Sequence, residues 1–153
     1  IEACERIMEQ MPQRPETRYT AEGRAYYQPR TDTVTMPLRE TFASPALFYG
    51  TWFHEAVHST GAGHRLARKS LSDWAPFGSA EYSREELVAE MGAGFLCAAA
   101  GIDGATLENS AAYIQSWLQV LKDDRRAVIV AAGQAQKAAD FILNHSAEDE
   151  PTH

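Results

Sequence analysis

The sequence predicts an α+β fold in which a small antiparallel or mixed sheet packs on one buried helix, with further helices C-terminal to it. Three observations predict this arrangement. Residues 19–37 are rich in β-forming side chains, residues 44–61 place largely apolar residues at helical spacing, and residues 82–144 hold three more helical patterns. The length of 153 residues suits one domain with a sizeable core, which we place at residues 1–146.

Composition and charge argue against several classes of protein. The net charge is −7 and no long basic run occurs, so the domain carries no electrostatic footprint for nucleic acid. Two cysteines, Cys4 and Cys97, are too few for a disulfide framework, which favours a reducing cytoplasm. No apolar run is long enough to span a membrane, so we expect no membrane contact. Because the chain starts at Ile1, we expect a piece of a longer protein.

The N-terminal third predicts one helix and a hairpin. Residues 1–11 have apolar positions at helical spacing, and Pro12 ends that pattern. Residues 25–27 and 34–36 are mostly β-formers, separated by a turn at residues 28–32. The segment 18–20 is a candidate third strand of the same sheet.

The central helix carries the strongest motif of the chain, His54-Glu55-x-x-His58. Ser44 is a good N-cap, Pro45 fits the first helical position, and a glycine at position 61 ends the helix. Histidines four residues apart share one helix face, where one zinc ion can bind both. Glu55 is then the natural general base for a metal-bound water. The alternative, two satisfied or exposed histidines, fits this well-formed buried helix poorly.

Three further helices follow the motif. The first covers residues 82–101, with Ser83 as N-cap and Glu86 completing a capping box. The second opens at residues 109–110, and the third begins after Asp123 or Asp124 and runs to about residue 144.

Two less regular segments complete the chain. Residues 72–80 form a loop that we expect to cover part of a cleft beside the motif. Residues 147–153 are acidic, and we expect them to form a flexible tail.

A catalytic zinc site usually has three protein ligands, and His64 is one candidate for the third. It follows Gly61 at the spacing H-E-x-x-H-x-x-G-x-x-H, in which the glycine lets the chain return to the metal. That spacing also requires a methionine turn beneath the metal. Met91, the only downstream methionine, lies inside a helical pattern, which argues against His64.

A glutamate on the next helix is the other candidate. Glu86 and Glu90 are four apart, and their face continues with the small residues Ala93 and Cys97, which would let two helices approach closely. We therefore prefer Glu86 as third ligand and Glu90 as the acceptor for the other N–H of a ligating histidine. Glu85, Glu90 and His64 stay open as alternatives for the ligand. By themselves, these glutamates would be interpreted as a solvated helix face.

With these residues in view, the chain resembles the C-terminal zincin-like metallopeptidase domain of ArdC-type antirestriction proteins, which mobile genetic elements carry. The matching segments are Glu2–Ile7, Ala25–Pro37, Phe53–Gly61, Glu85–Ala93 and Tyr113–Leu121. The resemblance does not carry His64 over as a ligand, because the family often has a different sequence after the glycine.

The resemblance implies a zincin-like fold, a zinc ion and a bacterial cytoplasmic location. A strand of the sheet in such a fold borders the cleft and can pair with an extended protein or peptide substrate. It also implies an N-terminal domain that binds single-stranded DNA, absent from the present chain, and a role in protecting incoming DNA from restriction. DNA contact is therefore expected mainly through that missing domain.

Two functional hypotheses follow. In the first, the domain is a zinc metallopeptidase: His54, His58 and Glu86 hold the metal, Glu55 activates the water, and His64 or Tyr82 lines the pocket. In the second, the same zinc site is a non-catalytic module of an antirestriction protein that masks DNA or binds partner proteins.

Overall fold

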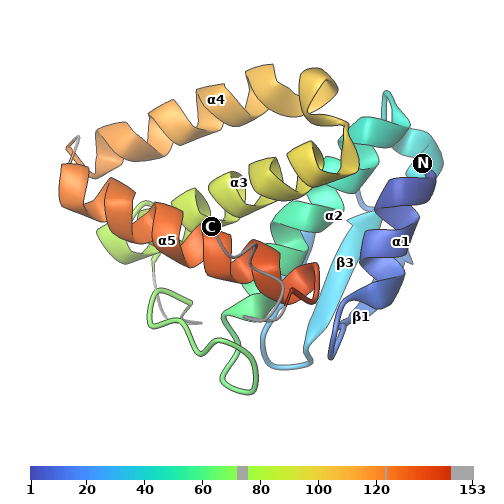
Figure 1. The fold of residues 1–153 in the computed structure, drawn as a ribbon, viewed down its shortest axis with the longest axis horizontal. Coiled ribbons are helices and arrows are strands. Elements are labelled where there is room, and N and C mark those ends of the chain that lie inside the picture. Colours follow the sequence, from blue (N-terminus) through green and yellow to red (C-terminus); the bar gives the residue numbers. More distant parts are fainter. Residues whose placement is uncertain (72–75, 123, 146–153) are drawn as a thin grey trace, which may run out of the picture.

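A three-stranded sheet and a group of helices make up residues 1–71, 76–122 and 124–145, the part of the chain that the computed structural model describes. In chain order the elements are α1 (Glu2–Gln10), β1 (Glu16–Thr20), β2 (Tyr26–Gln28), β3 (Thr33–Pro37), the 3-10 turn η1 (Arg39–Thr41), α2 (Pro45–Thr60), α3 (Ala80–Ala100), α4 (Asp103–Val120) and α5 (Arg125–Ile142). Figure 1 shows α2 at the centre, with α1 and the sheet on one side and α3, α4 and α5 on the other. This confirms the predicted α+β architecture.

The sheet has the strand order β1-β3-β2 and is mixed. Strand β3 is buried along its whole length and pairs with β1 in parallel and with β2 antiparallel. The predicted hairpin is therefore the β2–β3 pair, and the candidate third strand is β1, which pairs with the far side of β3. Strand β2 lies at an edge of the sheet.

Helix α2 begins and ends where its capping residues predict. The Ser44 side chain accepts a hydrogen bond from the Leu47 backbone N–H, Pro45 is the first helical residue, and Gly61 follows the last. Most of α2 is buried, because the sheet covers one side of it and α3 the other. A helix held on both sides keeps its polar face in a fixed orientation.

A glycine sets the distance between α2 and α3. A Cβ atom at Gly92 would lie 2.8 Å from a Val57 methyl carbon, which is closer than such atoms can approach. The sequence predicts small residues at Ala93 and Cys97 for this approach, whereas the structure places the closest point at Gly92. This close approach places Glu90 and Glu86, two and six residues earlier on α3, beside α2.

Two predicted helix starts are wrong. Helix α3 begins at Ala80, and its N-cap is Ser79, whose hydroxyl accepts from the Tyr82 N–H. Ser83 lies fully buried inside the helix, so the predicted capping box does not form. Gly78, with a φ of +81°, makes the left-handed turn that lets the helix start earlier.

Helix α4 likewise starts at Asp103 instead of residue 109, because the left-handed Gly101 ends α3 and reverses the chain within two residues. The prediction for α5 is confirmed: Asp124 caps it by accepting from the backbone N–H groups of residues 126 and 127.

Some expectations fall outside the described residues. They concern residues 72–75 of the loop after α2, residue 123 and the acidic tail 147–153. Among the helices that are described, none combines the length and apolar character that a membrane crossing requires.

Candidate metal centre

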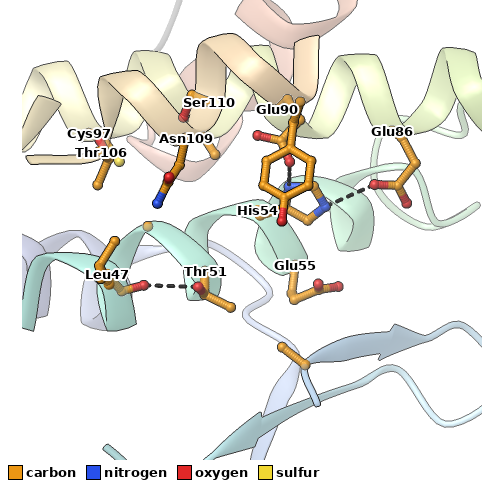
Figure 2. A pocket seen from close by; sticks show the side chains of 14 residues that line it. Leu47, Thr51, His54, Glu55, Glu86, Glu90, Cys97, Thr106, Asn109 and Ser110 are labelled. Atoms are coloured by element: carbon orange, nitrogen blue, oxygen red, sulfur yellow. Dashed lines mark hydrogen bonds and ion pairs between the residues drawn. The ribbon is translucent and has the colours of Figure 1, made fainter. Parts of the chain in front are cut away.

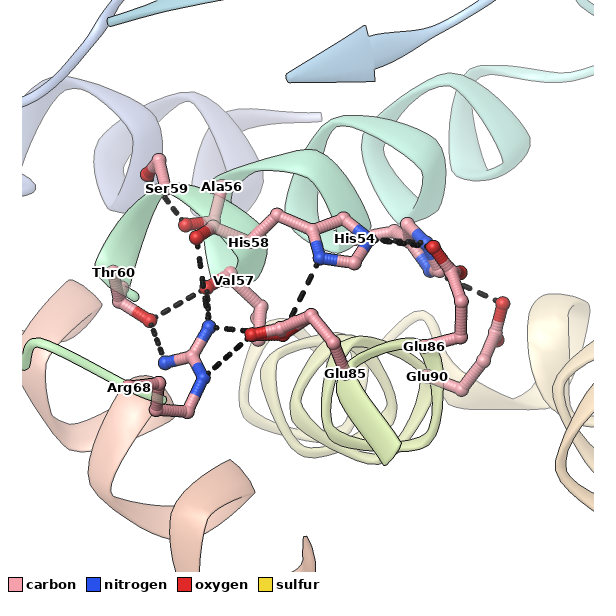
Figure 3. Close-up of polar contacts among 10 residues, drawn as sticks. All are labelled: His54, Ala56, Val57, His58, Ser59, Thr60, Arg68, Glu85, Glu86 and Glu90. Carbon is pink, nitrogen blue, oxygen red and sulfur yellow. Dashed lines mark hydrogen bonds and ion pairs between the residues drawn. The ribbon is translucent and has the colours of Figure 1, made fainter. Parts of the chain in front are cut away.

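His54 and His58 lie one turn apart on the face of α2 that meets α3. Their Nε2 atoms are 3.2 Å apart, and Glu86 of α3 reaches both of them. One Glu86 oxygen lies 3.1 Å from His54 Nε2, and the other lies 3.1 Å from His58 Nε2 (Figure 3). The structure thus brings together two imidazoles and one carboxylate, with one potential ligand atom from each lying within 4.8 Å of the others.

This donor set has the chemistry and spacing of a zinc site. Two nitrogens bound tetrahedrally at about 2.0–2.1 Å from zinc would lie about 3.3 Å apart, close to the distance between the two Nε2 atoms. Two histidines and one glutamate are also a ligand combination found in catalytic zinc sites, where a fourth position stays open. The residues present therefore fit a bound zinc ion.

Two outer carboxylates orient the histidine rings. Glu90 Oε1 lies 3.1 Å from His54 Nδ1, as the sequence predicts for Glu90. Glu85 Oε2 lies 3.5 Å from His58 Nδ1, an ion-pair distance that is long for a hydrogen bond. With Nδ1–H directed to Glu90, the His54 ring leaves its Nε2 lone pair facing the shared centre, which is the tautomer that binds metal. His58 Nδ1 has only the longer ion-pair contact with Glu85.

Glu85 is itself held by Arg68, a residue for which the sequence had suggested no role. The Arg68 Nε lies 2.8 Å from Glu85 Oε1, and the guanidinium also donates to the Thr60 hydroxyl and the Val57 carbonyl oxygen (Figure 3). Both charged side chains are almost completely buried. A Cβ atom at Gly61 would lie 2.9 Å from Arg68 Nη2, so this glycine also makes room for the guanidinium.

The charges in the centre are strongly coupled. Burial lowers the pKa of both histidines, but the facing carboxylates outweigh it: the pKa of His58 is raised to about 9 and that of His54 well above its ordinary value. Burial raises the pKa of Glu86, yet the two imidazoles bring it far below the ordinary value. Without metal, protons on the histidines balance the carboxylates, and a cation would replace those protons.

Two cavities meet at this centre and share Ala25, His54, Glu55 and Glu86 as lining residues. The β2-side cavity, of about 430 Å³, extends along residues 24–27, Pro29 and Tyr82. The α4-side cavity, of about 390 Å³, extends between α2 and α4 (Figure 2). Together they form a cleft with the candidate metal centre in its middle. Glu55, although nearly buried, lines both halves.

The predicted pocket residues have different positions. Tyr82 lines the β2-side cavity, and burial together with the charges of Glu86 and Glu55 raises the pKa of its phenol, so that it stays protonated. His64 is about half exposed and lies 3.5 Å from Asp32 in the hairpin turn, away from the other histidines. It lines neither of the two cavities.

The residue after His64 ties the hairpin to the end of α2. The Arg65 guanidinium donates to both Asp32 oxygens, at 2.7 and 2.8 Å, and Tyr27 donates its hydroxyl to the same carboxylate at 2.7 Å. Burial and this carboxylate raise the pKa of Tyr27 to about 12. Since Tyr27 belongs to β2, this group of side chains fixes the edge strand beside the cleft.

Helix α4 supplies lining residues that the sequence did not reveal. Thr106, Asn109, Ser110 and Tyr113 follow helical spacing and face the α4-side cavity. The polar pair at residues 109–110 was the only signal, and it indicates a helix start as readily as a cavity wall.

Comparisons with known proteins agree with this geometry. The sequence model of a zincin-like metallopeptidase family matches residues 2–134. The chain is 40% identical over 120 residues to the uncharacterized protein y4eC of Sinorhizobium fredii, covering 78% of this chain and 38% of that protein. It is 39% identical over 125 residues to the DNA primase TraC of Escherichia coli, covering 82% of this chain and 8% of TraC.

Solved structures extend the comparison. The antirestriction protein ArdC from plasmid R388, in a Mn(II)-bound crystal structure, superposes with a TM-score of 0.73 at 40% identity, over 97% of this chain and 52% of ArdC. The metal-free ArdC structure gives a TM-score of 0.70 at 41% identity, over 98% of this chain and 51% of ArdC. The chain thus spans about half the length of ArdC, 38% of the length of y4eC and 8% of the length of TraC.

Proposed function

Because the chain belongs to the zincin-like metallopeptidase family, we propose that it is the zinc-dependent peptidase domain of an antirestriction protein. One observation carries this proposal: His54, His58 and Glu86 converge on a single point in the middle of a cleft, and Glu55 lines both halves of that cleft. A structural metal site would be closed on all sides, whereas this one opens onto space for a substrate.

Each component of the site has a separate role in peptide hydrolysis. A bound zinc ion would polarise the scissile carbonyl and lower the pKa of a water molecule. Glu55 accepts the proton of that water and then passes it to the leaving amine. Tyr82, whose phenol keeps its proton, donates a hydrogen bond to the oxygen on which negative charge develops.

Strand β2 offers a place for the substrate main chain. It is an edge strand of the sheet, and residues 24–27 and 29 line the β2-side cavity. An extended peptide laid along β2 would gain main-chain hydrogen bonds with little dependence on its sequence. The bond to be cut would then lie at the shared centre, above Glu55.

The test compares metal content and peptide cleavage in wild type, Glu86→Gln and Glu55→Gln. We expect about one zinc per chain in wild type, loss of tight zinc binding in Glu86→Gln, and full zinc binding with cleavage reduced by a factor of about 10³ or more in Glu55→Gln. Equal cleavage by Glu55→Gln and wild type would overturn the assignment of the general base. Zinc binding unchanged in Glu86→Gln but lost in His64→Ala would overturn the ligand set.

The comparisons also favour a second candidate, a non-catalytic zinc-binding module. The matching region forms 8% of a protein named a DNA primase and 52% of one named an antirestriction protein, so similar domains occur in proteins with different activities. Such a module would mask DNA or bind partner proteins, with DNA contact made mainly by an N-terminal single-stranded-DNA-binding domain. In the whole protein, Glu55→Gln would then leave antirestriction intact, whereas the peptidase proposal expects its loss.

A further inference from the structure

The α4-side cavity extends well beyond the candidate metal centre. Its far end is closed, because Thr106 and Cys97 are buried there and the Thr106 methyl lies only 3.3 Å from the position of a Cβ atom at Gly50. Its mouth is open, because Asn109 and Tyr113 of α4 are exposed. A volume of about 390 Å³ with one closed end is large enough for a long side chain of a bound peptide.

The polar groups along this cavity offer hydrogen-bond acceptors. The Thr51 hydroxyl donates its proton to the Leu47 carbonyl oxygen at 2.9 Å, so its oxygen lone pairs stay available. Figure 2 shows Asn109 directed from α4 toward α2, and its side-chain amide can accept a hydrogen bond through Oδ1. A ligand that carries several N–H groups can therefore donate to both walls.

The charged groups that line the cavity have one dominant sign. They are His54 and the carboxylates Glu55, Glu86 and Glu90, and the lining includes no lysine or arginine. The β2-side cavity differs, since Arg24 lines it. A bound zinc ion would add two positive charges against the three carboxylates and leave His54 neutral, so the lining keeps a net charge of about −1, which favours a cation and disfavours an anion. The apolar residues Leu47 and Ala93 can cover the aliphatic part of a long basic side chain.

We propose that the α4-side cavity is a substrate subsite for a lysine or arginine side chain adjacent to the peptide bond to be cut. Asn109 and Thr51 are its specificity-determining residues, because they accept hydrogen bonds from the cationic head group. This inference rests on the proposed function and assigns to it a substrate class, peptides with a basic residue next to the scissile bond.

The test measures binding separately from cleavage. Zinc-loaded Glu55→Asp protein keeps the carboxylate charge but shortens the side chain of the general base, so cleavage during the titration is slow. It is titrated with short synthetic peptides that are identical except at one position, which carries lysine, arginine, glutamine, leucine or glutamate, and each peptide position is varied in turn. We expect one position at which lysine and arginine bind at least about tenfold more tightly than glutamate. Adding Asn109→Lys should abolish that preference, and adding Asn109→Asp should increase it.

Gln115 provides the matched control, because it lies exposed on the same helix and outside the lining of the cavity. Gln115→Lys adds the same charge as Asn109→Lys and should leave the preference unchanged. Equal effects of the two substitutions, no preference at any position, or no binding of any peptide would each overturn the subsite. A basic preference that persists while wild type cleaves none of the peptides would overturn the peptidase proposal and keep the subsite.

Discussion

At the scale of single residues, the candidate centre depends on what each histidine does with its second ring nitrogen. Glu90 lies 3.1 Å from His54 Nδ1, and Glu85, held by Arg68, lies 3.5 Å from His58 Nδ1. These outer carboxylates orient both rings so that the Nε2 atoms face one point. The outer residues therefore support metal binding without binding the metal themselves.

Replacing Glu90 should weaken metal binding without removing a ligand. Glu90→Gln keeps the shape of the side chain but no longer offers a charged acceptor to His54, so we expect zinc affinity to fall by a factor of about 10–100. Competition with a chromophoric chelator measures this affinity. Glu81→Gln, an exposed position near the start of the same helix, is the control and should bind zinc like wild type. Wild-type affinity in Glu90→Gln would contradict the orienting role.

The histidine pKa values predict how metal-free protein responds to pH. The pKa of His58 is about 9 in the folded chain, against an ordinary value of 6.5 that applies after unfolding. A raised pKa means that the folded state binds the proton more tightly, so this stabilisation is fully present below pH 6.5 and is lost as the pH rises through 9. Glu86, with its lowered pKa, contributes stability that is lost only in acid, below this window.

We therefore expect the unfolding temperature of metal-stripped protein to fall between pH 6.5 and 9. Thermal unfolding followed by circular dichroism checks this. In zinc-loaded protein the trend should be absent or reversed, because deprotonated histidines bind the metal better. A metal-stripped His58→Gln variant should show a weaker pH dependence than wild type, and an identical dependence would contradict the assignment.

At the scale of elements, the close packing of α3 on α2 places Glu86 and Glu90. Gly92 is the closest point, since a Cβ atom there would meet Val57 of α2 at 2.8 Å. Glu90 lies two residues before Gly92 on α3, and Glu86 lies about one turn before Glu90. Any outward shift of α3 would therefore carry both carboxylates away from the histidines.

Gly92→Ala should disturb stability and metal binding together. We expect a loss of about 1–3 kcal/mol of unfolding free energy, as in other overpacked interfaces, and weaker zinc affinity because α3 must move outward. Urea unfolding and chelator competition measure the two effects. Gly94→Ala is the matched control: its Cβ atom meets nothing within 4 Å, and it should stabilise the helix by about 0.5–1 kcal/mol. Similar behaviour of the two variants would contradict the proposed role of Gly92.

The hairpin depends on a second contact between elements, the Arg65–Asp32 pair. Because the Arg65 side chain is buried and Asp32 also accepts from Tyr27, Asp32→Asn should loosen β2 beside the cleft. If β2 binds the substrate main chain, the KM for peptides should rise severalfold while zinc content stays at the wild-type level. Steady-state kinetics with metal analysis checks this, and an unchanged KM would remove β2 from the substrate site.

At the scale of the whole molecule, the candidate centre joins two parts of the fold. The histidines belong to α2, which packs on the sheet, and Glu86 belongs to α3, which packs on α4 and α5 (Figure 1). A metal bound by all three residues would connect these parts. Zinc at about 100 times its dissociation constant should therefore add about 2.7 kcal/mol to the unfolding free energy. Unfolding of Glu86→Gln at the same zinc concentration should show little of this gain.

The sequence by itself determined the α+β class, the capped helix α2 and the candidate residues His54, Glu55, His58, Glu86 and Glu90. These follow from local chemistry, because caps, helical spacing and i, i+4 pairs act within a few residues. Only the tertiary structure decided the buried Arg68–Glu85 pair, the start of α3 at Ala80, the parallel pairing of β1 and the α4 wall of the cleft. Those features join residues far apart in the chain, or depend on turns such as Gly78 and Gly101, so the path of the backbone sets them.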